Sequence, residues 1–216
     1  MEKIKNGVTE LVFILDESGS MSGMEKDTVG GFNSMIEKQK EAEGKAFVST
    51  IMFSNRSKTV HDRIELTDVP QLTEKDYTPG GMTALLDTIG GAITHIESIH
   101  RYIRKEDVPE KTIFIITTDG YENASHKYSS QKIKEMIKEK EENGWEFLFV
   151  AANIDAVETA EKIGIRPERA ANYDVSLGTD TMYREVSCAL KHYRMKGSID
   201  DSWKDEIEAT TKRKKR

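Results

Sequence analysis

One acid and two hydroxyls stand at alternate positions near the start of the chain, in the order Asp16, Ser18 and Ser20. They follow directly on the apolar run 11–15, which is continuous and therefore predicts a strand buried on both faces. In open α/β sheets, ligand sites lie at the carboxyl ends of such strands. Carboxylate and hydroxyl oxygens are hard donors of the kind that Mg²⁺ prefers, so this segment predicts a metal site.

Two more oxygen donors occur downstream in comparable positions. Thr83 follows a Gly-Gly turn and comes just before the apolar-periodic segment 84–96, and Asp119 follows the buried strand 112–118. The two acids bring two negative charges, which match the charge of a divalent cation, and the hydroxyls bring neutral oxygens. The candidate metal ligands are Asp16, Ser18, Ser20, Thr83 and Asp119.

In this order and context, the five residues resemble the metal-ion-dependent adhesion site (MIDAS) of von Willebrand factor type A domains. The resemblance covers residues 8–193 and looks like that of an intracellular bacterial or phage-type member with a complete motif. It implies that Ser18 and Ser20 bind the ion directly, while Thr83 and the acids bind it directly or through water. It also implies that an Asp or Glu of a partner protein fills an open position on the ion.

The elements that must position these residues alternate between strand and helix. This order predicts a doubly wound α/β fold, with helices on both faces of a mostly parallel sheet. The resemblance implies the same fold, with one antiparallel edge strand, and the alternating segment 59–66 is the expected edge. We expect strands at 8–15, 46–53, 59–66, 111–118 and 145–151, helices at 24–42, 83–102, 129–143, 156–163 and 179–196, and a weaker strand before the last helix.

We expect one type A domain over residues 1–197 and a carboxyl-terminal extension over 198–216. Ile199, Trp203 and Ile207 are spaced four apart, which predicts a short amphipathic helix. Either this extension docks on the domain through Trp203, or it is a docking helix or basic tail for a partner.

Without the five basic residues at its end, the chain has 27 cations against 38 anions. Such a charge argues against general nucleic-acid binding.

The compartment can be predicted from what the sequence lacks. Cys188 is the single cysteine, so no internal disulfide can form, which favours a reducing compartment. Residues 1–6 lack the apolar core of an export signal, and no apolar run approaches the ~20 residues of a membrane-spanning helix. We therefore expect a cytoplasmic protein that binds no membrane.

Two classes of function fit a metal at this place. The first is a metal-dependent protein–protein interaction module, and the second is a Mg²⁺-dependent hydrolase or phosphatase using Asp16. Phosphatases of the haloacid dehalogenase type need a second acid two residues after the nucleophile, where this chain has Ser18. No His has an evident relation to the serines, and no G-x-S-x-G motif surrounds them. We expect a binding module and no enzyme.

The ion and the partner can be predicted only by class. Hydroxyl ligands and a small ligand count favour Mg²⁺ or Mn²⁺ over Ca²⁺. By the resemblance, the partner could be a chaperone-like AAA+ ATPase or a component of a stress-response complex.

Four nearby polar residues are expected to have ordinary roles: Glu17 faces solvent or stands behind the ligands, Asp87 and His126 lie on the surface, and Asp155 caps the helix that follows it.

Overall fold

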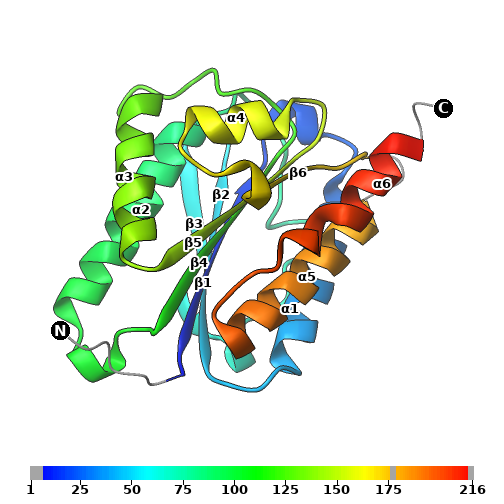
Figure 1. The fold of residues 1–216 in the computed structure, drawn as a ribbon. Helices are drawn as coiled ribbons and strands as arrows, with labels where there is room; N and C mark the ends of the chain where they lie inside the picture. The colour runs from blue at the N-terminus through cyan, green and yellow to red at the C-terminus, as the bar shows by residue number, and fades with distance from the viewer. Residues whose placement is uncertain (1–6, 176–178, 214–216) are drawn as a thin grey trace.

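The computed structural model describes residues 7–175 and 179–213. Residues 1–6, which we expect to lack an export signal, and residues 214–216 of the basic tail lie outside this described part. A central six-stranded sheet separates two layers of helices, and its strand order is β3-β2-β1-β4-β5-β6 (Figure 1). The predicted doubly wound α/β fold is confirmed.

The sheet is parallel except at one edge. β3 runs antiparallel to β2 and forms that edge, as the alternating sequence of β3 predicted. β6 is a short parallel strand at the other edge, where we expected a weaker strand before the last helix. The strands are β1 (Thr9–Asp16), β2 (Ala46–Phe53), β3 (Ser57–Glu65), β4 (Lys111–Thr118), β5 (Trp145–Ala151) and β6 (Ala170–Asn172).

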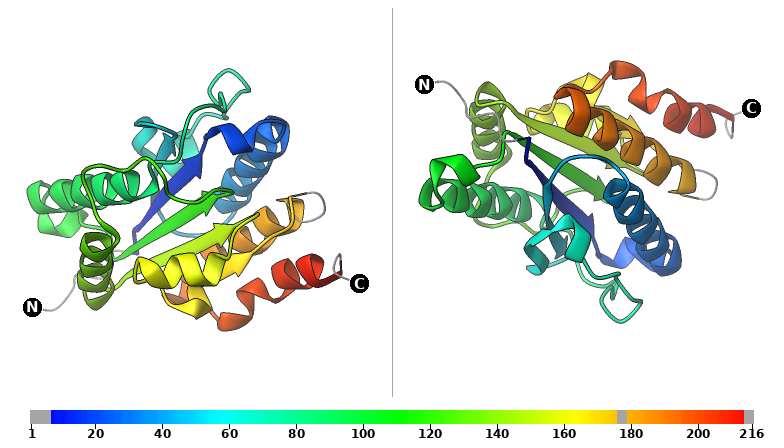
Figure 2. Two further views of the ribbon diagram at one scale, coloured as in Figure 1. Left: turned by 90° about the horizontal axis from the view of Figure 1, so that it is seen from above. Right: turned by 90° about the horizontal axis from the view of Figure 1, so that it is seen from below.

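The helices divide between the two faces of the sheet, as Figures 1 and 2 show. One layer contains α1 (Glu25–Lys40), α5 (Thr179–Lys196) and α6 (Asp205–Arg213), and the other contains α2 (Leu85–Tyr102), α3 (Ser130–Glu142) and α4 (Ala156–Lys162). No helix in the described part of the chain is both long and apolar enough to cross a bilayer.

The central strand β1 has no polar face because helices cover both sides of it. Leu11, Phe13 and Leu15 point into the core beneath α1 and α5, while Val12 and Ile14 point into the core beneath α2 and α3. Every residue of β1 is buried. This two-sided burial is the physical reason for a continuous rather than an alternating apolar run.

The strand order reverses between β1 and β4. β1 pairs in parallel with β2 on one side and with β4 on the other, and Leu15 lies opposite Thr117. Chain connections leave in opposite directions at such a point, and the ligand sites of open α/β sheets lie beyond the carboxyl ends of its strands. Figure 2 shows β1 and β4 ending at the same side of the molecule. Asp16, at the end of β1, and Asp119, directly after β4, therefore lie close together.

The carboxyl-terminal extension packs on the domain. Ile199, Trp203 and Ile207 are buried in the same core as α1 and α5, and Trp203 Nε1 donates to the carbonyl of Glu168 at 2.9 Å. The apolar face of this segment is thus buried against the rest of the same chain. The division of the chain at residue 197 stays a prediction.

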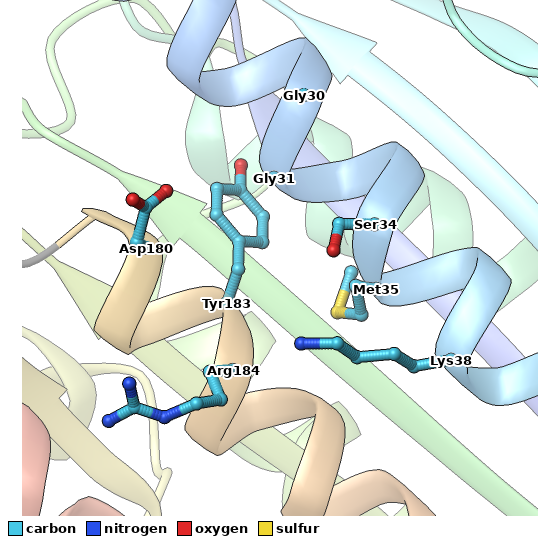
Figure 3. A pocket seen from close by; sticks show the side chains of 8 residues that line it. All are labelled: Gly30, Gly31, Ser34, Met35, Lys38, Asp180, Tyr183 and Arg184. Carbon is cyan, nitrogen blue, oxygen red and sulfur yellow. The ribbon is translucent and has the colours of Figure 1, made fainter.

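A close contact joins α1 to α5 beside a small cavity of about 240 Å³. Figure 3 shows the ring of Tyr183 lying against α1 at Gly31. A Cβ placed on Gly31 would lie 2.0 Å from Tyr183 Cδ2, whereas one on the neighbouring Gly30 would meet nothing within 4 Å. None of the predicted metal ligands lines this cavity.

The two neighbouring glycines give a matched prediction. We expect Gly31→Ala to lower the free energy of unfolding by about 1–3 kcal/mol, because the buried Tyr183 ring must move. Gly30→Ala should raise it by about 0.5–1 kcal/mol, since Gly is a poor helix former and the site is open. Urea denaturation of both variants measures the difference. Equal effects would show that the contact between α1 and α5 is looser than described.

Candidate metal centre

The structure brings the five predicted ligands together at the carboxyl ends of β1 and β4. Asp16 ends β1, and Ser18 and Ser20 lie in the loop that follows it. Thr83 lies just before α2, and Asp119 directly follows β4. All of them except Ser20 are buried, and Asp16 is only 1% exposed.

The side-chain oxygens lie near one another, and several of them are joined by hydrogen bonds. Ser18 Oγ and Ser20 Oγ are 3.1 Å apart, and Ser20 Oγ donates to Asp119 Oδ1 at 2.5 Å. Thr83 Oγ1 and Ser20 Oγ each lie 3.4 Å from the point that a Cβ on Gly120 would occupy. Asp16 Oδ1 accepts a hydrogen bond of 2.7 Å from the backbone N–H of Ser18. Residues about a hundred positions apart therefore present their oxygens to one place.

This donor set fits a small divalent cation. Neighbouring oxygens of an octahedral Mg²⁺ shell, with bonds of about 2.1 Å, lie about 3.0 Å apart, close to the separation of the two serine hydroxyls. The described residues contain no group of three or more His, Cys, Asp or Glu side chains that could hold a metal. Any ion held here would therefore depend on hydroxyls as well as on Asp16 and Asp119.

The electrostatics of the two acids also favour a cation. Burial raises the pKa of Asp16 above its ordinary value, although hydrogen bonds from Ser18 and Thr118 oppose this rise. Burial also raises the pKa of Asp119, and the nearby charge of Asp16 raises it further. Two buried carboxylates that repel each other become more stable when a positive ion lies between them.

Thr118 is a functional residue that sequence reasoning missed. Its Oγ1 donates to Asp16 Oδ2 at 2.5 Å, so both oxygens of the Asp16 carboxylate are fixed. The contact follows from the register of β1 on β4, in which Leu15 lies opposite Thr117. No motif in the sequence specifies that register. The only available signal was the position of Thr118 directly before Asp119.

The backbone around Thr83 is held by two asparagines that the sequence did not single out. Asn123 Oδ1 accepts from the N–H of Thr83 at 2.8 Å, and the N–H of Asn123 donates to the carbonyl of Thr83 at 3.1 Å. Asn55 Oδ1 accepts from the N–H of Met82 at 2.7 Å. Gly81 has a φ of +80°, and Asn55 Oδ1 occupies the space that a side chain there would need. Glycine is therefore required at position 81.

Asp87 is more than the surface residue that we predicted. It is half-buried, and its carboxylate accepts three hydrogen bonds, from the backbone N–H groups of His126, Lys127 and Tyr128. Burial acts to raise the pKa of Asp87, but these three bonds and the charge of Lys127 together lower it below its ordinary value. Asp87 thereby fixes the loop between β4 and α3 against the start of α2.

The same loop satisfies the amino-terminal end of α2. Ala84, at the N-cap position, has no side chain that can accept a hydrogen bond. Instead, Glu122 Oε2 accepts from the N–H of Leu86 at 2.8 Å, and Ser125 Oγ accepts from the N–H of Asp87 at 2.9 Å. Unsatisfied N–H groups at a helix start need such partners. Residues of the loop after β4 thus hold the first turn of α2, which directly follows Thr83 and Ala84.

The other polar residues can now be placed. Glu17 is buried rather than solvent-facing, and its carboxylate pairs with Lys58 Nζ at 3.2 Å behind the ligands. His126 is exposed on the loop after β4, as predicted. Asp155 caps α4, also as predicted, by accepting from the N–H of Glu158 at 2.9 Å.

Comparison with known proteins decides the family. The family model of the von Willebrand factor type A domain matches residues 10–184. The chain belongs to the von Willebrand factor type A domain family. This match covers β1 to α5 and therefore includes all five predicted ligands. A search of curated proteins found no match.

Several solved structures share the type A fold at low sequence identity. Proximal thread matrix protein 1 from the mussel byssus, with a zinc-occupied MIDAS motif, is 14% identical with a TM-score of 0.60. Manganese-loaded TRAP protein of Plasmodium vivax is 15% identical, with a TM-score of 0.57. The type V pili tip protein Mfa5 of Porphyromonas gingivalis is 8% identical, with a TM-score of 0.63.

These matches differ in how much of each chain they include. The alignments cover 86%, 81% and 89% of this chain, in the same order. They cover 46% of the mussel protein, 72% of TRAP and 98% of the Mfa5 domain. This chain thus spans less than half of the mussel structure. Likeness at this level of identity establishes the fold alone.

Thr118 gives a test of how the site is organised. We expect Thr118→Val to weaken Mn²⁺ binding by about tenfold or more, because Asp16 loses the donor that orients its carboxylate. Thr117→Val is the matched control, since the Thr117 hydroxyl reaches only the carbonyl of Ile14, at 3.4 Å. Isothermal titration calorimetry with Mn²⁺ measures both. Equal affinities in the two variants would contradict this role for Thr118.

Proposed function

We propose that this type A domain is a metal-dependent protein–protein interaction module. Asp16, Ser18, Ser20, Thr83 and Asp119 would hold Mg²⁺ or Mn²⁺, and the ion would supply a Lewis-acidic attachment point for an Asp or Glu of a partner. The observation that carries this proposal is the composition of the oxygen cluster, which has two carboxylates and three hydroxyls. Two carboxylates only balance a divalent charge, so the ion keeps its attraction for one more anion.

The surface around the cluster supports a protein as the ligand. Met82 is 50% exposed directly before Thr83, and Tyr121 is 57% exposed two residues after Asp119. They are two of four large apolar side chains that are exposed in the described part of the chain. Exposed aromatic and Met side chains beside a polar centre are typical of protein interfaces.

The environment of Asp16 argues against the phosphatase alternative. A nucleophilic carboxylate of the haloacid dehalogenase type works with a second acid two residues further on, which acts as general acid. This chain has Ser18 at that position, and the hydroxyl of Ser18 lies against Ser20 in the oxygen cluster. We therefore propose a binding role without catalysis.

Compartment and partner remain parts of the proposal. The single cysteine favours the reducing environment of the cytoplasm. A chaperone-like AAA+ ATPase, or a subunit of a stress-response complex, is the kind of partner that we propose. In either case the binding surface of the partner must offer an accessible Asp or Glu.

Metal removal tests the proposal. With the chain immobilised in Mg²⁺, we expect a protein from the source cell to be retained and then released by EDTA. Ser18→Ala combined with Ser20→Ala should abolish this retention, because two neutral metal ligands are lost. The matched control combines Ser22→Ala with Ser34→Ala, at two exposed serines outside the cluster. Retention that survives both EDTA and the double substitution would place the interface away from the metal.

A further inference from the structure

A cationic pocket opens beside the metal centre. It has a volume of about 420 Å³ and lies between the β2–β3 turn, the start of α2 and the loop after β4. Arg56, His126 and Lys127 contribute ionisable basic side chains to its lining. All three are exposed, and none of them forms an ion pair with another residue of the described part.

The single acid in the lining does not neutralise this pocket. Asp87 lies at its wall as a charged carboxylate, which the N–H groups of His126, Lys127 and Tyr128 stabilise. Arg56 and Lys127 outnumber it, so the lining keeps a net positive charge. The whole chain has a formal charge of −6, so a lining with a net positive charge contrasts with the average charge of the chain. Free basic groups within an acidic surface attract an anion to that one place.

The pocket and the metal centre share their framework. Ala84 lines the pocket and is bonded to the candidate ligand Thr83, about 3.8 Å away between Cα atoms. Asn55 lines the pocket and also holds the N–H of Met82. Ala124 lines it and directly follows Asn123, which holds Thr83. The residues that hold Met82 and Thr83 in place therefore also form part of the pocket wall.

We propose that this pocket is a second binding site for the same partner, and that it takes a second carboxylate of an acidic segment. This inference rests on the proposed function, because the first carboxylate of that segment binds the metal ion. In an extended segment, residues two apart lie roughly 7 Å from each other and point to the same side. A partner with acids two to four positions apart reaches the metal and the pocket together.

Defined peptides test the inference. The probes are short Gly-Ser peptides with one central Asp, or with that Asp and a second one two, three or four positions away. Chemical-shift titration of the full chain in Mg²⁺ measures their affinities even when binding is weak. We expect at least one two-Asp peptide to bind about fivefold more tightly than the one-Asp peptide, through exposed charge pairs in the pocket. In EDTA, neither kind should bind.

Variants assign the gain to the pocket. Arg56→Gln combined with Lys127→Gln should remove the advantage of the two-Asp peptide and leave the affinity of the one-Asp peptide unchanged. Lys138→Gln combined with Lys191→Gln is the matched control, because it removes two exposed charges on α3 and α5. This control should keep the advantage.

The outcomes separate the two proposals. Equal affinities of both peptide kinds in Mg²⁺, with binding lost in EDTA, would overturn the pocket and leave the metal-docking function standing. An advantage that persists in the Arg56 and Lys127 variant would also overturn the pocket. Binding that does not require the metal would overturn the docking function and this inference with it.

Discussion

The parallel pairing of β1 with β4 is the constraint on which the rest of this site depends. It aligns Leu15 with Thr117, so that Thr118 meets Asp16 and Asp119 emerges beside Ser20. The strand order reverses at this pair, and open α/β sheets place their ligand sites beyond the carboxyl ends of strands at such a point. A slip of one residue would turn Thr118 to the other face of the sheet and leave Asp16 without its donor.

The second constraint is the small number of carboxylates among the predicted ligands at the ends of β1 and β4. Hydroxyls supply three of the five predicted ligands, and the acids that could add charge are engaged elsewhere. Glu17 pairs with Lys58, and Asp87 holds backbone N–H groups of the loop after β4. The same loop provides Asn123 to Thr83, so the start of α2, the candidate metal centre and the adjoining pocket form one framework. An ion held there would attract a ligand from outside the chain.

Local pattern was enough to predict most of the fold. The continuous runs of β1, β4 and β5 and the apolar periodicity of α2 and α5 predicted elements that the structure places within one or two residues. Oxygen-bearing side chains at strand ends also indicated the cluster, and its metal remains a prediction. Contacts that depend on strand register or on loop packing could not be predicted. Nothing in the sequence near Thr118, Asn55 or Asn123 indicates which distant residues they contact. Asp87 was misjudged for the same reason, since its partners lie about forty positions away.

The most direct test of the central claim is water-proton relaxation by Mn²⁺ bound to the chain. We expect one Mn²⁺ to bind per chain and to retain rapidly exchanging water, because the protein leaves part of its coordination open. An acidic peptide should then reduce the relaxation enhancement by displacing water. Absence of Mn²⁺ binding, or a bound ion without exchangeable water, would contradict the view that this cluster holds a cation in need of one more ligand.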